Sequence, residues 1–177
     1  MDDEREKATE ENIENFLKEF KPLFNTYIDN ELPNFLTNKF SRIYWEYDNH
    51  EFIKVQFKLE NQRMIGKKIG RSSEFLVLNL KQVVGYKKGI FKSMINFIET
   101  VCQEKKINLH VSQILNPILT NNLEINGYKI LKEEWDTDVN AVKIFDNLGN
   151  GDGKKKKSKK RSKKRSKKHS KKHIYYK

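Results

Sequence analysis

The sequence predicts an α+β fold, with a mixed, mostly antiparallel central sheet flanked by helices and a disordered C-terminal tail. Helix-like apolar periodicity at the N-terminus gives way to strand-like alternation over residues 43–60. A long amphipathic pattern over residues 90–102 then separates two short apolar runs, so the two corresponding strands should lie parallel in the sheet. The last 27 residues are almost entirely cationic and polar.

The N-terminal third predicts helices followed by a hairpin. Thr9 can cap the first helix, whose apolar residues recur every three or four positions. Pro22 is expected to open a second helix at its first turn, and Pro33 to end it. Residues 43–47 and 51–60 then form a hairpin around residues 48–50, because polar and apolar side chains alternate along the second segment.

The remaining segments complete the sheet. Gly66 and Gly70 bracket a loop or a short strand. Residues 75–80 are apolar on both faces, which is typical of a central strand. The order after it is helix, strand, helix and two closing strands, expected at residues 90–102, 107–114, 116–126, 128–133 and 141–146. The domain is therefore expected over residues 9–148, between a flexible N-terminus (1–8) and the tail (149–177).

The net charge of the chain is carried by this tail. Residues 151–177 contain 13 Lys, 2 Arg and 1 Asp, a net charge of +14, whereas residues 1–150 contain 21 basic and 23 acidic residues, a net charge of −2. Four consecutive Lys precede four copies of Ser-Lys-Lys-Arg/His over residues 154–173. Such density of like charge disfavours folding and predicts contact with nucleic acid or another polyanion, or a nuclear localisation signal.

Several classes of protein are excluded by the residues present. The single cysteine, Cys102, cannot form an internal disulfide, and it belongs to an apolar helix stripe that predicts a buried thiol. No signal peptide or membrane-spanning apolar run is evident, so we expect a soluble intracellular protein without membrane contact, cytoplasmic or nuclear. There is no Cys/His cluster with metal-ligand spacing, no nucleophile elbow and no P-loop.

Two segments within residues 75–131 carry a family resemblance. Gln82, Val83, Val84, Gly85, Tyr86 and Lys87 look like a Gln/Arg-x-x-Gly-x-Gly/Ala loop leading into a helix. Residues 116–128, from Asn116 to Gly127 and Tyr128, have the spacing of an Asn-to-Gly-Phe segment. Together they resemble the acyl-CoA-binding half of the GCN5-related N-acetyltransferases, of which this chain would be a degenerate member.

The resemblance implies a ligand and a site. The ligand would be acetyl-CoA, with its pyrophosphate held by the loop and its pantetheine arm in a splay between strands 75–80 and 107–114. The binding residues it implies are Leu80, Gln82, Val83, Val84, Gly85, Tyr86, Lys87, Lys88 and Asn116. Independently of any family, N–H groups and the dipole at a helix start attract anionic oxygens. An ordinary strand-to-helix turn is the alternative for this loop.

The sequence departs from that family at two positions and leaves the catalytic residues unknown. Lys87 stands where a second small residue is usual, and moving the motif to Gly89 puts Phe91 there instead. Leu123 stands where many members carry a tyrosine that protonates the departing thiolate. Glu60 and Glu74 are candidate bases. His110 is a candidate catalytic residue, and the alternatives are that its side chain faces solvent or lies in the core with its hydrogen bonds satisfied. The alternative function is a non-catalytic polyanion-binding protein on the same scaffold.

Overall fold

The computed structural model describes residues 5–38, 44–70, 75–132 and 139–145. These residues form an α+β fold in which one six-stranded sheet, in the order β1-β2-β3-β4-β6-β5, is flanked by helices. All neighbouring strands are antiparallel except β3 and β4, which are parallel as expected. The predicted fold class is therefore confirmed for the domain. The tail, for which disorder and polyanion contact were expected, lies outside the described residues.

The first helix, α1 (Glu10–Asn38), is continuous, so the expectation of two helices divided at Pro22 was wrong. Pro22 and Pro33 both lie inside this helix at exposed positions. A helical proline leaves the carbonyl four residues earlier without its partner, and those residues, Lys18 and Asp29, are also exposed and accessible to water. The buried stripe runs on past both prolines: Phe16, Phe20, Phe24, Tyr27, Ile28 and Phe35.

The predicted hairpin is present, with its turn at residues 50–52 rather than 48–50. β1 (Tyr44–Asn49) pairs with β2 (Ile53–Asn61), and β2 alternates between buried and half-buried residues along its length. A short helix, α2 (Arg63–Lys68), replaces the loop or strand expected between Gly66 and Gly70. It lies against the sheet face opposite α1 and α3, where Ile65 and Ile69 pack on Phe75, Val77 and Val142.

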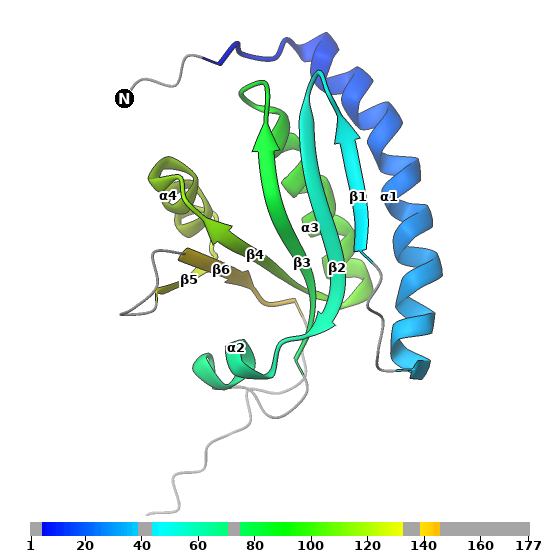
Figure 1. Cartoon of the computed structure of the whole chain (residues 1–177), viewed down its shortest axis with the longest axis vertical. Coiled ribbons are helices and arrows are strands. Elements are labelled where there is room, and N and C mark those ends of the chain that lie inside the picture. Colours follow the sequence, from blue (N-terminus) through cyan, green and yellow to red (C-terminus); the bar gives the residue numbers. More distant parts are fainter. Residues whose placement is uncertain (1–4, 39–43, 71–74, 133–138, 146–177) are drawn as a thin grey trace, which may run out of the picture.

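The central strand and the long helix were also predicted, and the strand is longer than expected. β3 (Leu76–Gly85) leads into α3 (Ile90–Lys105), and β4 (Asn108–Ile114) returns beside β3. Next come α4 (Pro117–Ile125), β5 (Lys129–Lys132) and β6 (Val139–Lys143). In Figure 1, α1 runs along the β1 side of the sheet, and β4 diverges from β3 toward α4.

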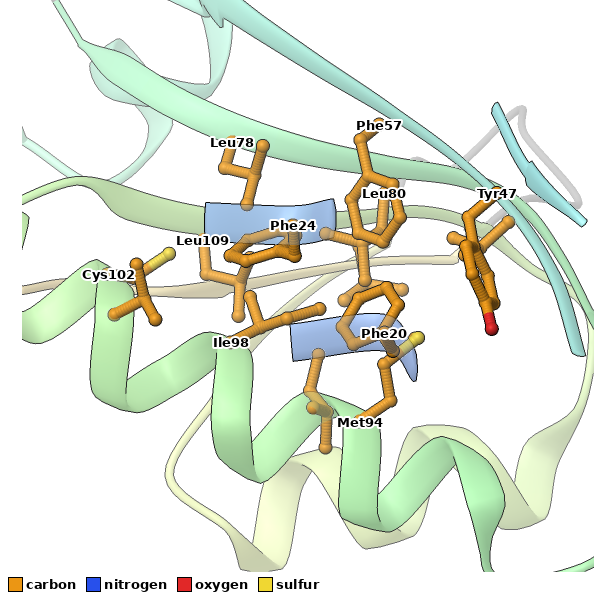
Figure 2. Packing of buried hydrophobic residues seen from close by; sticks show 14 of the residues in the cluster. Phe20, Phe24, Tyr47, Phe57, Leu78, Leu80, Met94, Ile98, Cys102 and Leu109 are labelled. Carbon is orange, nitrogen blue, oxygen red and sulfur yellow. The ribbon is translucent and has the colours of Figure 1, made fainter. Parts of the chain in front are cut away.

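The main core lies between the sheet and the helices α1 and α3. Figure 2 shows Phe20 and Phe24 from α1 between Phe57 and Leu80 of the sheet and Met94 and Ile98 of α3. Cys102 is also buried there, and burial raises the pKa of its thiol, which fits the inert core position that was expected. This core holds β3, β4 and α3 in place beneath the candidate site.

Candidate functional site

The two central strands pair over a short distance and then separate. Four residue pairs join β3 to β4, from Val77 with Asn108 to Leu80 with Val111. Just beyond this ladder, β3 has a bulge in which Gln82 and Val83 stand opposite the single residue Val55 of β2. Gln82 has φ +50°, a left-handed backbone conformation that residues other than glycine seldom adopt. The bulge increases the local twist and ends the pairing with β4.

A second bulge lies at the same level in β4. Ser112 and Gln113 stand opposite the single residue Asn140 of β6, and Gln113 has φ +59°. The two neighbouring strands therefore both carry a bulge and a strained glutamine immediately after their last shared pair. Strained backbone of this kind persists where the surrounding structure holds it, often beside binding or catalytic sites.

The divergence opens a groove of about 480 Å³ between the strand ends. One wall comes from the end of β3 and the other from β4, its following loop and α4. Its lining residues are Gln82, Val83, Val84, Val111, Ser112, Gln113, Ile114, Leu115, Asn116 and Leu119. We call this cavity the strand groove.

Asn116 lies where the strand groove meets α4. It caps this helix through its side-chain Oδ1, which accepts the Ile118 N–H at 2.9 Å, and Pro117 occupies the first helical position. Since Oδ1 makes the cap, the side-chain Nδ2 remains the donor of this amide. Asn116 therefore has a structural role and also faces the groove.

A second cavity of about 290 Å³ adjoins the strand groove at the start of α3. The two cavities share Val83, Asn116 and Leu119 as lining residues. The second one, which we call the basic pocket, is also lined by Arg5, Gly85, Lys87, Lys88, Gly89, Phe91, Lys92, Ile118 and Asn122. Its cations and its place at a helix N-terminus favour an anionic ligand.

The N–H groups of Tyr86, Lys87 and Lys88 are already engaged, so they are not free to hold the pyrophosphate as the resemblance implied. Tyr86 and Lys87 both donate to the carbonyl of Phe52, at 2.9 and 3.4 Å. Lys88 donates to the carbonyl of Glu6 at 2.9 Å. The physical reason is that the β1–β2 turn and the N-terminal segment both reach this loop, and neither contact has a signature in the motif.

The turn into α3 is made at Gly89. Gly89 has φ +95° and precedes the first helical residue, whereas Gly85 belongs to the end of β3 and pairs with Ile53. Among the residues that the structure describes, no hydrogen-bond acceptor faces the N–H groups of Ile90, Phe91 or Lys92. The groups available to an anion therefore lie a few residues after the predicted loop.

Residues 5–8, part of the segment for which flexibility was expected, pair with this loop. Lys7 and Lys88 form a parallel bridge, and the Ala8 N–H donates to the Lys88 carbonyl at 3.0 Å. The Arg5 guanidinium donates to the Gly85 carbonyl at 2.8 Å. A Cβ on residue 85 would lie 3.0 Å from that guanidinium, so the absence of a side chain at Gly85 permits this close approach.

The Lys87 side chain has its charge largely committed elsewhere. Its Nζ lies 3.4 Å from Glu51 and 3.6 Å from Glu6, and 5.6 Å from the centre of the Phe52 ring. Two of the residues that the resemblance implied do not line either cavity: Leu80 is buried in the core, and Tyr86 is exposed. The other implied residues do line them: Gln82, Val83, Val84, Gly85, Lys87, Lys88 and Asn116.

The candidate bases have different surroundings. Glu60 is half-buried. It accepts hydrogen bonds from the side chains of Asn79 and Gln62 and forms an ion pair with Lys58. Burial alone would raise the pKa of the Glu60 carboxyl, but these partners together hold it below its usual value and engage both of its oxygens. Glu74 lies outside the described residues. Leu123 is buried in the core and offers no proton.

His110 is buried, and only one of its ring nitrogens has a partner. Its Nε2 lies 3.2 Å from the Asn140 Oδ1, while Nδ1 has no partner among the described residues. Burial lowers the pKa of the ring to about 4, so His110 is neutral near pH 7. Neither alternative to catalysis that the sequence left open therefore applies, because the His110 ring is buried and its Nδ1 has no hydrogen-bond partner among the described residues.

Several residues of the site have no signature in the sequence. Ser112, Gln113, Leu115 and Leu119 line the groove, but a bulge at glutamine has no sequence signature. Arg5 lies eighty residues from Gly85, so only the folded chain brings them together. Over the described residues, no group of three or more His, Cys, Asp or Glu could hold a metal ion, and no helix is long and apolar enough to cross a membrane.

Comparisons with protein-family models, with curated proteins and with solved structures found no significant match to this chain.

Proposed function

We propose that this protein binds acetyl-CoA and transfers its acyl group to an amine nitrogen, the activity implied by the resemblance to the GCN5-related N-acetyltransferases. The observation that carries the proposal is the strand groove, opened by matched bulges in β3 and β4. Its walls include the apolar side chains of Val83, Ile114 and Leu119, which suit the thin, largely apolar acyl-pantetheine arm.

The basic pocket suits the pyrophosphate of the same ligand. Lys88 and Lys92 supply positive charge, and the helix start supplies the N–H groups of Ile90, Phe91 and Lys92. Because the two cavities adjoin, one elongated molecule with an anionic end and an apolar end can occupy both. Asn116, at their boundary, can donate from Nδ2 to a carbonyl of the arm.

A charge reversal in the basic pocket tests this proposal. Lys92 is exposed in the first turn of α3, where a carboxylate is favourable for the helix dipole. Lys92→Glu should therefore leave the protein folded while it repels the ligand phosphates. Loss of one charge-assisted contact corresponds to about 1.5–3 kcal/mol, or a roughly 10- to 100-fold weaker Kd for acetyl-CoA in calorimetry of the full chain.

The matched control is Lys18→Glu, the same charge change at an exposed position of α1. It should leave the Kd unchanged apart from a small long-range effect. No binding of acetyl-CoA to the wild-type chain, or equal weakening by both variants, would reject the proposed ligand site.

The tail supports a second component, contact with nucleic acid or another polyanion through residues 154–173. Its net charge of +14 over residues 151–177 is the observation that favours it. Binding of this kind releases counterions, so the affinity should fall steeply as salt rises. We expect the full chain to bind DNA or RNA with a steep salt slope and a chain cut at Gly149 to bind far more weakly. Equal binding by the two chains would contradict this role.

The alternative, a non-catalytic polyanion-binding protein, is favoured by Leu123. This residue is buried at the position where many members of the resembled family carry a tyrosine. In that case acetyl-CoA would give no calorimetric signal and the tail would still bind nucleic acid. The two measurements together therefore separate the alternatives.

A further inference from the structure

A row of polar side chains crosses the sheet beside the strand groove, on the face opposite α1 and α3. Glu60, Asn79, His110 and Asn140 come from β2, β3, β4 and β6, and Asn79 and His110 are register partners in the parallel pair. Asn79 is 1% exposed and His110 is 2% exposed, so both are removed from water. A polar row so deeply buried is costly unless its hydrogen bonds are complete.

The row is incomplete at its centre. Asn79 donates from Nδ2 to Glu60, which leaves Oδ1 as its acceptor, and this Oδ1 has no partner among the described residues. Asn140 Oδ1 can only accept, so His110 donates to it from Nε2 and keeps a lone pair on Nδ1. Nδ1 likewise has no partner in the part of the chain that the structure describes. Two buried acceptors on adjacent strands are therefore both without a donor.

We infer that Asn79 Oδ1 and His110 Nδ1 receive the acceptor nitrogen of the substrate, a primary amine on an unbranched alkyl chain. A primary amine carries two N–H donors, which match two unpaired acceptors, and it retains a lone pair for attack. This inference rests on the proposed acyl transfer and deepens it, because it assigns residues and a substrate shape to the side that receives the acyl group.

The position of the pair agrees with this role. Asn79 and His110 lie one residue before Leu80 and Val111, the last pair before the strands separate. Ser112, the next residue of β4 with a side chain on the same face as His110, already lines the strand groove. Because both side chains are almost closed to solvent, the inference restricts the amine to a terminal –NH₂ on a slender chain and excludes branched and aromatic amines.

The burial of the pair favours the neutral form of an amine. Burial is the main cause that lowers the pKa of His110, whereas the two nearest charges act in opposite senses, since Glu60 raises this pKa and Lys81 lowers it, and these two side chains are themselves paired at 3.8 Å. A buried amine whose neighbouring charges oppose one another loses its extra proton more easily than it does in water, because burial disfavours the charged form. The neutral amine is the nucleophilic form.

The transfer step balances with these residues. The amine nitrogen forms a bond to the acyl carbon, the bond from that carbon to the thioester sulfur breaks, and the electron pair leaves with sulfur. The amine proton passes to His110 Nδ1, while Nε2–H stays bonded to Asn140. The imidazolium then returns that proton to the thiolate, a task for which Leu123 has no group.

Binding of the amine can be tested without acetyl-CoA. In the full chain with isotope-labelled histidine, n-butylamine should shift the His110 Nδ1 resonance, while His50, which is exposed in the β1–β2 turn, stays unchanged. tert-Butylamine, a primary amine on a branched carbon, is the matched control and should not shift it. No shift with n-butylamine, or equal shifts with both amines, would overturn the inference.

Turnover provides the second test. With acetyl-CoA and n-butylamine, His110→Gln should lower kcat/KM by roughly 10²- to 10⁴-fold, the usual contribution of a general base. The calorimetric Kd for acetyl-CoA should not change, and His50→Gln should behave as wild type. If acetyl-CoA binds and His110→Gln turns over normally, this inference fails and the proposed function stands. If acetyl-CoA does not bind at all, the proposed function itself fails.

Discussion

The aromatic core beneath α1 and the junction of β3 with β4 are built in opposite ways. In the core, Phe20 packs against six aromatic rings with centroid distances from 5.0 to 6.1 Å, and its side chain is fully buried. At the junction, two glutamines have positive φ, and Asn79 Oδ1 and His110 Nδ1 are buried without a partner among the described residues. The core is regularly packed apart from the Tyr27 hydroxyl, which is also buried without such a partner, whereas the junction combines backbone strain with two unmet hydrogen bonds.

This difference indicates where stability and function reside. Strain and unpaired polar atoms cost free energy, and proteins keep them at sites that bind or react while regular packing elsewhere compensates. The core should therefore dominate the free energy of unfolding, and the junction should tolerate or even benefit from changes that remove its irregularities. Changes at Phe20, His110 and Gln113 should show that contrast, from the largest effect to the smallest.

The largest effect is expected for Phe20→Ala. Removing a fully buried ring leaves a cavity among its aromatic neighbours, and such changes typically cost about 3–5 kcal/mol. The free energy of unfolding can be measured by urea denaturation. Phe20→Leu, which keeps most of the volume, should cost clearly less. Equal losses for the two variants would show that the site collapses or that ring contacts matter little.

A smaller, pH-dependent effect is expected from His110. Burial holds the pKa of the folded-state ring at about 4, against an ordinary value of 6.5. The unfolded chain therefore binds more protons between these values, and stability present above pH 6.5 is lost as the pH falls toward 4. The full difference is about 3 kcal/mol.

Urea denaturation of wild type and His110→Gln across this pH window measures the contribution of His110 titration to the free energy of unfolding. The carboxylates titrate in both proteins, so the difference between the two curves isolates His110. The loss caused by Phe20→Ala should be independent of pH in the same window, because no titratable group is removed. A wild-type curve parallel to that of His110→Gln would contradict the depressed pKa.

The smallest effect is expected at the bulges. A non-glycine residue in the left-handed region costs about 1–2 kcal/mol, and a β-branched residue costs more. Gln113→Gly should therefore be neutral or stabilising by up to about 1 kcal/mol, whereas Gln113→Val should destabilise. The corresponding substitutions Gln82→Gly and Gln82→Val should rank in the same order of stability. A stabilising Gln113→Val would mean that the backbone abandons the bulge, and then the strand groove should close.

The fold was predictable where local periodicity agrees with the tertiary structure. The alternation over β2 and the four-turn stripe of α3 each bury one face, so their patterns predicted them correctly. The continuity of α1 could not be predicted, because whether Pro22 ends a helix depends on which face is exposed. α2 was missed for a similar reason. A glycine such as Gly66 indicates a loop in the sequence, but in the structure Gly66 lies inside this helix and is buried.

The candidate site was predictable in place but not in detail. Its location between the ends of β3 and β4 follows from the chain order. The engaged loop amides, by contrast, depend on Phe52 and Glu6, which approach from distant parts of the sequence. His110 was singled out, but its missing partner is a property of four strands together. A glutamine at positive φ has no signature in the local sequence, so neither bulge was predicted.

The short parallel ladder has a mechanical consequence. It joins two three-stranded halves of the sheet, β1-β2-β3 and β4-β6-β5, through four residue pairs, with α3 packed beneath both of its strands. Because so few pairs join the halves, we predict that this seam acts as a hinge and that swinging of the halves changes the width of the opening at their far end. Hydrogen exchange along Leu78 to Leu80 would report that movement, and an occupant wedged between the halves would slow it.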